Sequence, residues 1–354
     1  MKKVGIVLVN YKEYAGKYLS ACRDSLRTQT YSDFIVYIVD NASSTESLSY
    51  LKNLYPEAVI LPREDGNYCA ANNLGMNQAI LDGCDYLVAA NMDTEFEPDW
   101  LSKLVLALDN NPEAGIAQSL ILLYPKDEAE RQDPKINTTG NFIHFLFFGF
   151  TGDYNLKKSE VALTNYKEIT GYASGCSFII RREIFTEIGG YNEDYYMYHD
   201  DLDISLKTKL AGYKIILAAK SILWHKYEFE RSVRMLYYME RNRAISFLAF
   251  YPMPALILLS PVFLAMSLGM LLFSVVGGWF KTDLKVFGYF LKPSSWRLIF
   301  KLRHHLKLIT KKPISLISKT FKGRIEFQEI DNLILKYLVN PIFNAYWNLV
   351  KKII

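Results

Sequence analysis

Short apolar runs alternate with helical stretches through the first 123 residues, and this alternation limits the possible fold more than any other feature. The apolar runs are rich in Val, Ile and Leu, as is typical of strands that are buried on both faces. The order predicts an α/β fold with a mostly parallel, doubly wound sheet. The expected strands are Lys3–Asn10, Phe34–Asp40, Ala58–Pro62, Tyr86–Asn91 and Gly115–Leu123, with helices at Tyr14–Thr28, Glu46–Leu54, Ala71–Asp82 and Glu97–Asn110.

The alternation of apolar runs and helical stretches stops at residues 125–165, which we interpret as an insertion or a change of sheet. It then returns, with helices expected at Arg182–Ile188 and Asp201–Leu210 and a strand at Tyr213–Ala218. We therefore predict a catalytic or binding domain over residues 1–230.

Residues Ala244–Phe280 form a stretch of 37 residues without a charge. About 20 apolar residues suffice to span a bilayer, and a globular helix seldom runs so long without a polar face. We predict that residues 231–293 insert into a membrane. The four cysteines show no disulfide or metal spacing, which favours a reducing, cytosolic setting.

Residues 281–354 hold 15 Lys and Arg against 4 Asp and Glu, whereas the rest of the chain holds 26 against 33. Such a basic tail suits a polyanion, either nucleic acid or an anionic membrane. No nucleic-acid-binding motif is visible, so we expect residues 294–354 to form basic amphipathic helices on an anionic membrane surface, at Ser294–Thr310 and Leu333–Ile354.

Positive charge flanks the uncharged stretch on both sides, with Arg231, Arg234, Arg241 and Arg243 before it. Because positive flanks stay in the cytoplasm, both flanks are expected there. A hairpin or re-entrant insertion satisfies this expectation, and a single span from about Pro254 to Phe280 is the alternative. The single span would export the basic tail. We expect the protein at the cytoplasmic face of the cell membrane.

Polar residues follow four of the expected strands, at the sheet edge where α/β proteins bind their ligands. Neither a dinucleotide GxGxxG nor a Walker GxxxxGK[ST] motif follows the first strand, which excludes both phosphate-binding loops. The candidate ligand-binding residues at this edge are Asn10, Tyr11, Asp40, Asn41, Asp65, Asn91 and Asp93.

The cluster His199-Asp200-Asp201-Leu202-Asp203 opens an expected helix. Helix capping explains one or two of these carboxylates, which leaves one free to act as a general base. Farther along, His225 ends the apolar run ILWH. With Asp93 it offers an imidazole and a carboxylate for Mg²⁺ or Mn²⁺, with phosphates of a ligand completing the shell.

Seven sequence segments, in this order and spread over residues 3–243, resemble those of the inverting family 2 glycosyltransferases. The similarity is to the subgroup that contains rhamnosyl- and galactosyl-transferases of surface polysaccharides. The segments are VGIVLVNY, IVDNASS, EDGNYCAANNLG, VAANMDTEFEPDWL, TGYASGCSFIIRR, GGYNEDYYMYHDDLDISLKTKLAGYKI and LWH.

This resemblance implies a GT-A-type nucleotide-binding fold and a role for each matching residue. Asp40 would contact the donor base, and Asp65 would help to hold the nucleoside. Asn91-Met92-Asp93 corresponds to the Asp-x-Asp metal element, with Asp93 as ligand and His225 as its partner. Asp200-Asp201 takes the place of the Glu-Asp pair whose second member is the base, and Gly175 lies in the glycine-rich stretch near the sugar.

The expected activity is metal-dependent, inverting transfer of a hexose or deoxyhexose from a UDP- or dTDP-sugar. The expected acceptor is a lipid-linked saccharide, whose diphosphate Arg241 and Arg243 could meet. Two alternatives stay open: a membrane-tethered nucleotide-sugar-binding module without catalysis, and a polyprenyl-phosphate glycosyl synthase.

Overall fold

The computed structural model describes residues 1–227, 235–326 and 333–354. The chain divides into two compact units. The first contains residues 1–141, 151–209 and 213–227, and the second contains residues 142–150, 210–212 and 228–354. Arg231 and Arg234, which the sequence places before the uncharged stretch, lie outside the described residues.

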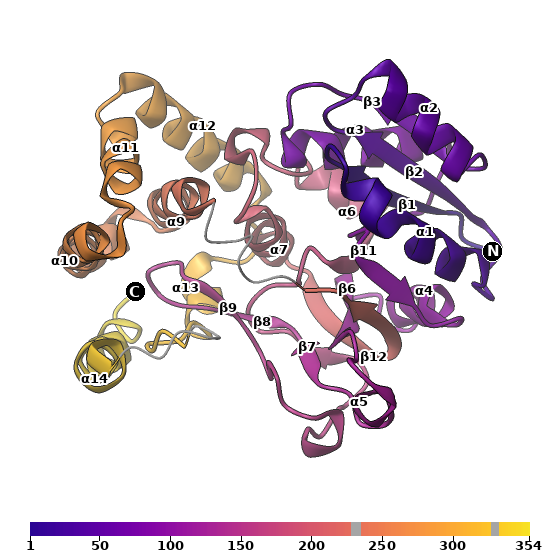
Figure 1. Ribbon diagram of the computed structural model, residues 1–354. Coiled ribbons are helices and arrows are strands. Elements are labelled where there is room, and N and C mark those ends of the chain that lie inside the picture. Colours follow the sequence, from indigo (N-terminus) through magenta and orange to yellow (C-terminus); the bar gives the residue numbers. More distant parts are fainter. Residues whose placement is uncertain (228–234, 327–332) are drawn as a thin grey trace. The chain divides into compact units, whose positions relative to one another are not determined.

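A ten-stranded mixed sheet forms the centre of the first unit within the described residues (Figure 1). Its main path runs β10-β12-β6-β11-β4-β1-β2-β3, while β5 pairs with β12 and β7 with β6. The strands are β1 (Val4–Asn10), β2 (Phe34–Asp40), β3 (Val59–Pro62), β4 (Tyr86–Ala90), β5 (Thr94–Phe96), β6 (Ala114–Leu123), β7 (Ile136–Thr138), β10 (Lys167–Glu168), β11 (Ser177–Arg181) and β12 (Lys214–His225).

The sheet departs from the expected mostly parallel arrangement at its centre. β11 lies antiparallel between β4 and β6, so these two strands are not neighbours in the sheet. Parallel pairing is kept among β1, β2, β3 and β4 and between β6 and β12. The fold is therefore mixed α/β, because a short apolar strand from the later sequence fills the gap in the middle of the sheet.

Helices cover both faces of this sheet. Ile6 and Leu8 of β1 belong to a buried cluster with Leu19 of α1 and Trp100 of α4. On the opposite face α3 packs against β1 and β2. The helices of the first unit are α1 (Tyr14–Arg27), α2 (Thr45–Leu54), α3 (Tyr68–Leu81), α4 (Trp100–Asp109), α5 (Glu128–Gln132), α6 (Arg182–Glu187) and α7 (Asp200–Leu210), with short 3₁₀ turns at Lys158–Glu160 and Glu193–Tyr195.

The segment Phe142–Phe150 belongs to the second unit, although it lies inside the region expected to form the first domain. Its ends form the small two-stranded sheet of β8 (Asn141–Ile143) and β9 (Gly149–Thr151). Phe145 stacks on Trp347 with ring centroids 5.1 Å apart, and Phe147 packs against Tyr251. This apolar segment thus supplies part of the aromatic core of the second unit.

The uncharged stretch folds as two helices rather than one. The chain breaks at Tyr251-Pro252, and the longer helix ends at Gly278 in the left-handed conformation, whereas Pro261 is accommodated inside it. The helices of the second unit are α9 (Leu236–Phe250), α10 (Met253–Gly277), α11 (Phe280–Phe290), α12 (Pro293–Ile309), α13 (Ile314–Ser318) and α14 (Asn340–Val350), with a π-helical turn at Leu335–Val339 before α14 (Figure 1).

Among the described residues, α10 is the one helix long and apolar enough to cross a membrane. Only 11% of its most apolar 18-residue window is buried within the protein, unlike the core helix of a soluble domain. Residues 235–293 and 294–326 lie in the same compact unit, so the structure draws no boundary at the expected junction near residue 293.

Candidate functional site

The carboxyl ends of β1 and β2 hold a buried polar pair. Asn10 and Asp40 are neighbours in the parallel register, and Asn10 Nδ2 donates to Asp40 Oδ1 at 2.8 Å. Ser47, in the first turn of α2, donates its hydroxyl to the other oxygen of Asp40. Asn10 Oδ1 in turn accepts from the amide of Ala15 at the start of α1. Asp40 is thus held rigidly at the sheet edge where a nucleotide would bind.

The loops after β1 and β3 meet beside this pair. Tyr11 is exposed, and its ring lies 3.2 Å from the point where a side chain at Gly66 would begin. The Tyr196 hydroxyl lies only 2.6 Å from the same point, and Gly66 has a positive φ of 72°. Only glycine fits there, because a Cβ would displace Tyr196 and strain the backbone.

The two remaining residues of this corner differ in their surroundings. Asp65 forms a bidentate ion pair with Arg63, at 2.6 and 2.8 Å, and Arg63 lowers the pKa of this partly exposed carboxyl. Asn41 is buried, and its Oδ1 accepts no hydrogen bond from the described residues. Asn41 therefore has an acceptor to offer a ligand, whereas Asp65 already has a cation.

The turn between β4 and β5 carries Asn91 and Asp93. Asn91 Oδ1 accepts from the hydroxyl of Tyr68 at 3.3 Å. Tyr68 comes from the first turn of α3, and burial together with the nearby Asp200 and Asp201 raises the pKa of its phenol. Tyr68 therefore connects the β4 turn with the acidic cluster.

Asp93 and His225 come together from parts of the chain that are far apart in the sequence. His225 pairs with Thr94 in the antiparallel ladder of β12 and β5, which places its Nε2 3.4 Å from Asp93 Oδ1. The other ring nitrogen lies 2.9 Å from Asn137 Oδ1, which fixes the ring orientation. Burial opposes the imidazolium, but Cys176 and Asp93 raise the pKa of His225 to about 10.

These side chains fit a divalent cation as a partial shell. Carboxylate oxygen and imidazole nitrogen suit Mn²⁺ and Mg²⁺, and Asn137 supplies the support that metal-binding histidines usually have. No group of three His, Cys, Asp or Glu side chains suitable for a metal occurs within residues 1–227, 235–326 and 333–354. The protein would thus offer two ligands and leave positions for phosphates.

Asp200 and Asp201 begin α7 directly after a strained loop. Tyr196, Tyr198 and His199 all have positive φ values, between 61° and 67°. Such angles are uncommon for non-glycine residues and cluster at functional sites. Burial and the adjacent Asp201 carboxyl raise the pKa of Asp200, and burial also raises the pKa of Asp201.

One face of α7 holds the glycine-rich loop that precedes β11. Asp201 Oδ2 accepts from the Gly175 amide at 3.2 Å, and one turn later Ser205 accepts from the Ala173 amide at 3.0 Å. A further turn on, the buried Lys209 donates to the carbonyls of Ile169, Thr170 and Gly171. Residues 201, 205 and 209 share a helix face because they are four apart.

These contacts between α7 and the glycine-rich loop place Gly175 next to the carboxyl groups of Asp200 and Asp201. A Cβ on Gly175 would lie 3.4 Å from the Asp201 Cβ and 3.9 Å from Asp200 Oδ2. The backbone of Gly175 thus lies close to both carboxyl groups. A carboxylate of this pair can accept a proton from a hydroxyl placed beside it.

Arg241 and Arg243 lie in the second unit, on α9, and both are buried. Arg243 forms a bidentate ion pair with Glu240 at 2.8 and 2.9 Å and lies over the rings of Phe148 and Phe263. Arg241 lies over three tyrosine rings, those of Tyr237, Tyr238 and Tyr289.

Sequence reasoning missed the residues that support the site. Asn137 lies in the stretch whose periodicity could not be read, and Lys209 resembles an ordinary surface lysine of a helix. Ser47 and Tyr68 each lie in the first turn of a helix that follows a predicted ligand-binding loop. This position is the sequence signal that could have identified them.

Comparison with known proteins gives consistent matches. The sequence model of glycosyl transferase family 2 matches residues 5–189. An N-acetylglucosaminyl-diphospho-decaprenol L-rhamnosyltransferase of Mycobacterium tuberculosis is 24% identical in an alignment 245 positions long, which covers 62% of this chain and 75% of that protein. The O-antigen biosynthesis protein RfbC of Myxococcus xanthus is 30% identical over 208 residues, but these cover 57% of this chain and only 16% of that protein.

Among solved structures, GalNAc-T7 in complex with UDP, GalNAc and Mn²⁺ has a similar fold. The TM-score is 0.56 at 16% sequence identity, and the match covers 72% of this chain and 49% of that one. At this identity the likeness concerns the fold, which is that of the GT-A glycosyltransferases.

Proposed function

Since the chain belongs to glycosyl transferase family 2, we propose that it moves a hexose or deoxyhexose from a UDP- or dTDP-sugar to a lipid-linked saccharide, with inversion. The observation that carries this proposal is the acidic pair Asp200-Asp201 facing Gly175, in the same unit as the Asp93–His225 pair.

The acceptor hydroxyl is a poor nucleophile, so a carboxylate must take its proton as the new bond forms. We assign this role to Asp201. Its Oδ2 is oriented by the Gly175 amide and its Oδ1 by its neighbour's amide at Leu202, which hold the carboxylate in one position. A single displacement from the face opposite the leaving group inverts the anomeric centre. The pKa of Asp200 is raised more than that of Asp201, so Asp200 would stay protonated to a higher pH. The two neighbouring carboxyl groups would then not both be negatively charged.

The nucleotide would lie along the edge formed by β1, β2 and β4. Asp40, fixed by Asn10 and Ser47, would accept hydrogen bonds from the base, and Tyr11 offers an exposed ring beside it. Asn41, Asp65 and Asn91 would complete the donor site. Asp93 and His225 would hold Mn²⁺ or Mg²⁺, which when bound neutralises the charge that grows on the leaving diphosphate.

Features of the second unit and the name of a relative support the proposal of a lipid-linked acceptor. The mycobacterial relative is named for an acceptor built on diphospho-decaprenol. In this chain α10 is apolar and mostly exposed, and the tail that follows is basic. An enzyme held at the cytoplasmic face of an anionic membrane gains most from an acceptor confined to the same surface, through effective concentration. Of the two arginines expected to meet its diphosphate, Arg243 already pairs with Glu240, so Arg241 is the candidate that we retain.

Calorimetry with UDP-, dTDP- and GDP-sugars, each with and without Mn²⁺, tests the donor half of the proposal. We expect tight binding of one uridine or thymidine donor, strengthened by the metal. Preference for a GDP-sugar would contradict the donor assignment.

The acceptor is tested separately, by comparing transfer to a polyprenyl-diphosphate-linked saccharide with transfer to the same saccharide free in solution. Equal efficiency with the soluble saccharide would contradict the lipid-linked acceptor.

A further inference from the structure

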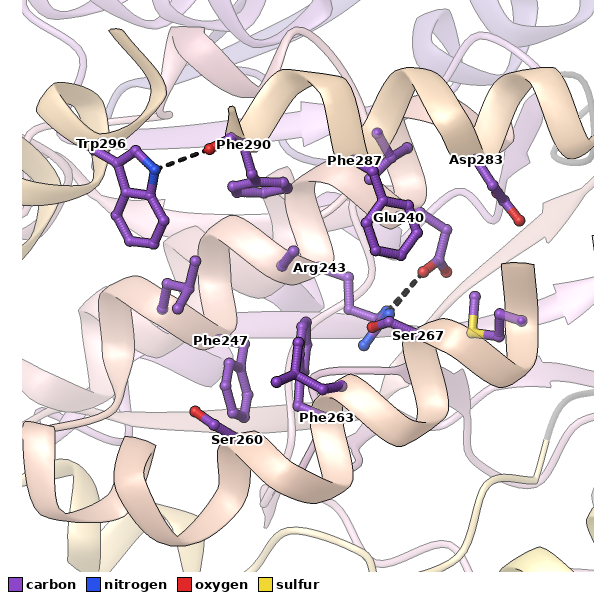
Figure 2. A pocket seen from close by; sticks show the side chains of 15 residues that line it. Glu240, Arg243, Phe247, Ser260, Phe263, Ser267, Asp283, Phe287, Phe290 and Trp296 are labelled. Carbon is purple, nitrogen blue, oxygen red and sulfur yellow. Dashed lines mark hydrogen bonds and ion pairs between the residues drawn. The ribbon is translucent and has the colours of Figure 1, made fainter. Parts of the chain in front are cut away.

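A cavity of about 240 Å³ lies among helices α9, α10, α11 and α12 of the second unit. Its wall is largely aromatic and aliphatic, with rings of Phe247, Phe263, Phe287, Phe290 and Trp296 pointing toward one another (Figure 2). Two of its lining residues, Leu264 and Trp296, are exposed. The cavity therefore reaches the surface between α10 and α12.

A space of this kind is not expected to stay empty or to fill with water. Native interiors contain few voids larger than a water molecule, and an apolar cavity destabilises a protein in proportion to its volume. Apolar cavities of about 150 Å³ remain dry and bind small apolar molecules. The lining thus selects a hydrocarbon occupant.

Charged groups gather at one end of the cavity. Arg243 is neutralised by its bidentate ion pair with Glu240, which Figure 2 shows beside Ser267. Asp283 is 5% exposed, and its Oδ2 accepts no hydrogen bond from the described residues. Burial raises the pKa of Asp283, as an apolar surrounding would. Arg243 is the basic residue of this lining, and its guanidinium is already paired with Glu240, so this end offers a phosphate no unpaired cation and the cavity suits a hydrocarbon chain.

We propose that this cavity takes the isoprenoid chain of the lipid-linked acceptor, an inference that rests on the proposed function. The chain reaches it from the lipid side, because the exposed apolar residues Leu264, Leu268 and Leu272 of α10 continue from the cavity along the helix. The phosphates stay outside the cavity, and Arg241, which lies on α9 but does not belong to the cavity lining, is their candidate partner. The cavity thereby selects acceptors by their chain.

Photolabelling of the full-length protein tests this proposal. A polyprenyl phosphate with a photoreactive group near the end of its chain is the probe, in nanodiscs of phosphatidylglycerol and phosphatidylcholine. We expect labelled peptides from α9 to α12 and competition by unlabelled polyprenyl phosphate. Ser267→Trp fills the cavity and should reduce labelling at least tenfold. Ala265→Trp adds the same side chain to an exposed position of α10 outside the cavity lining, and should label like the wild type.

Three results would overturn the assignment: labelling elsewhere, labelling that Ser267→Trp leaves unchanged, or labelling that falls as strongly when the phosphatidylglycerol fraction of the nanodiscs is raised as when unlabelled polyprenyl phosphate is added. The last would show a site for ordinary membrane lipid. Nucleotide-sugar binding by calorimetry in both variants checks that they fold. Photolabelling does not require the donor. If the protein binds the donor but is not labelled, the assignment of the cavity is wrong. If the wild-type protein does not bind any nucleotide sugar, the proposed function is wrong, whatever the labelling shows.

Discussion

Oδ2 of Asp201 lies 3.2 Å from the backbone nitrogen of Gly175, so the acidic pair and the glycine-rich loop hold each other in place. The proposed base thus has an orientation that does not depend on substrate. Asp201→Asn keeps the shape and an oxygen that can accept from Gly175, but it removes the basic charge. We expect kcat to fall by about 10²- to 10⁴-fold while donor affinity changes little.

Steady-state kinetics and donor calorimetry check this expectation, with Asp200→Asn as the matched variant. If Asp201→Asn turned over as fast as the wild type, Asp201 would not be the general base. Loss of turnover only in Asp200→Asn would move the base by one residue.

Lys209 should act as a positioning residue for the same loop. Lys209→Met leaves the carbonyls of Ile169, Thr170 and Gly171 without their buried cation, at a cost of about 1–3 kcal/mol in the free energy of unfolding. Because the loop also holds Gly175 against Asp201, kcat should fall as well. Lys207→Met is the control, since Lys207 is equally buried but pairs with Asp203 instead. Equal kcat values in the two variants at matched stability would show that Lys209 is merely structural.

Asp93→Ala should abolish the part of donor affinity that depends on Mn²⁺. The reason is that Asp93 supplies the buried carboxylate beside His225 Nε2. Glu95→Gln is a suitable control, because the carboxylate of Glu95 pairs with Lys226 at 2.6 Å. Calorimetry of donor binding with and without Mn²⁺ measures the effect, and full activity in excess chelator would speak against any metal.

Asp200→Asn should stabilise the protein near neutral pH. Burial and Asp201 raise the pKa of Asp200 above its value in the unfolded chain, so the folded protein binds this proton more tightly. The protonated Asp200 side chain therefore contributes stability at pH values below its pKa in the unfolded chain. This contribution is lost as the pH rises through the pKa of Asp200 in the folded protein. Unfolding by urea at pH 4 and pH 8 should therefore show a larger gain for the variant at pH 8. An equal gain at both pH values would indicate that Asp200 titrates normally.

The basic tail should remain on the cytoplasmic side. In an Ile354→Cys variant, a membrane-impermeant thiol reagent should label broken cells and spare intact ones. The four native cysteines are buried, so their background labelling should be low. Labelling of intact cells would show that the uncharged stretch crosses the membrane once rather than as a hairpin.

The strands at the N-terminal side could be predicted closely, because each is an uninterrupted apolar run bounded by polar turns. β2 begins and ends at the predicted residues, and β1 differs by one residue. β11 could not be predicted from local pattern. Its sequence SFIIR is short, and its place between β4 and β6 depends on pairing with strands far away in the chain.

The candidate site shows the same division. Asp40, Asp93 and the Asp200-Asp201 pair could be selected because polar residues at strand and helix ends are visible in the sequence. Their partners Asn137 and Lys209 could not, since a hydrogen bond to a histidine or to three carbonyls exists only after tertiary packing. Likewise, FIHFLFFGF is plainly apolar, but nothing in it reveals that it completes the core of the second unit.

The central place of β11 also has a consequence for biosynthesis. β4 and β6 have both left the ribosome well before Ser177–Arg181, yet neither has its partner on that side until β11 arrives. The nascent chain must therefore carry β4 and β6 with open hydrogen-bonding edges while about 50 more residues are synthesised, at a rate of roughly 5–20 residues per second. Open edges of this kind invite pairing with other chains. Rare codons or a bound chaperone over this interval would decide how much of the protein reaches its native state.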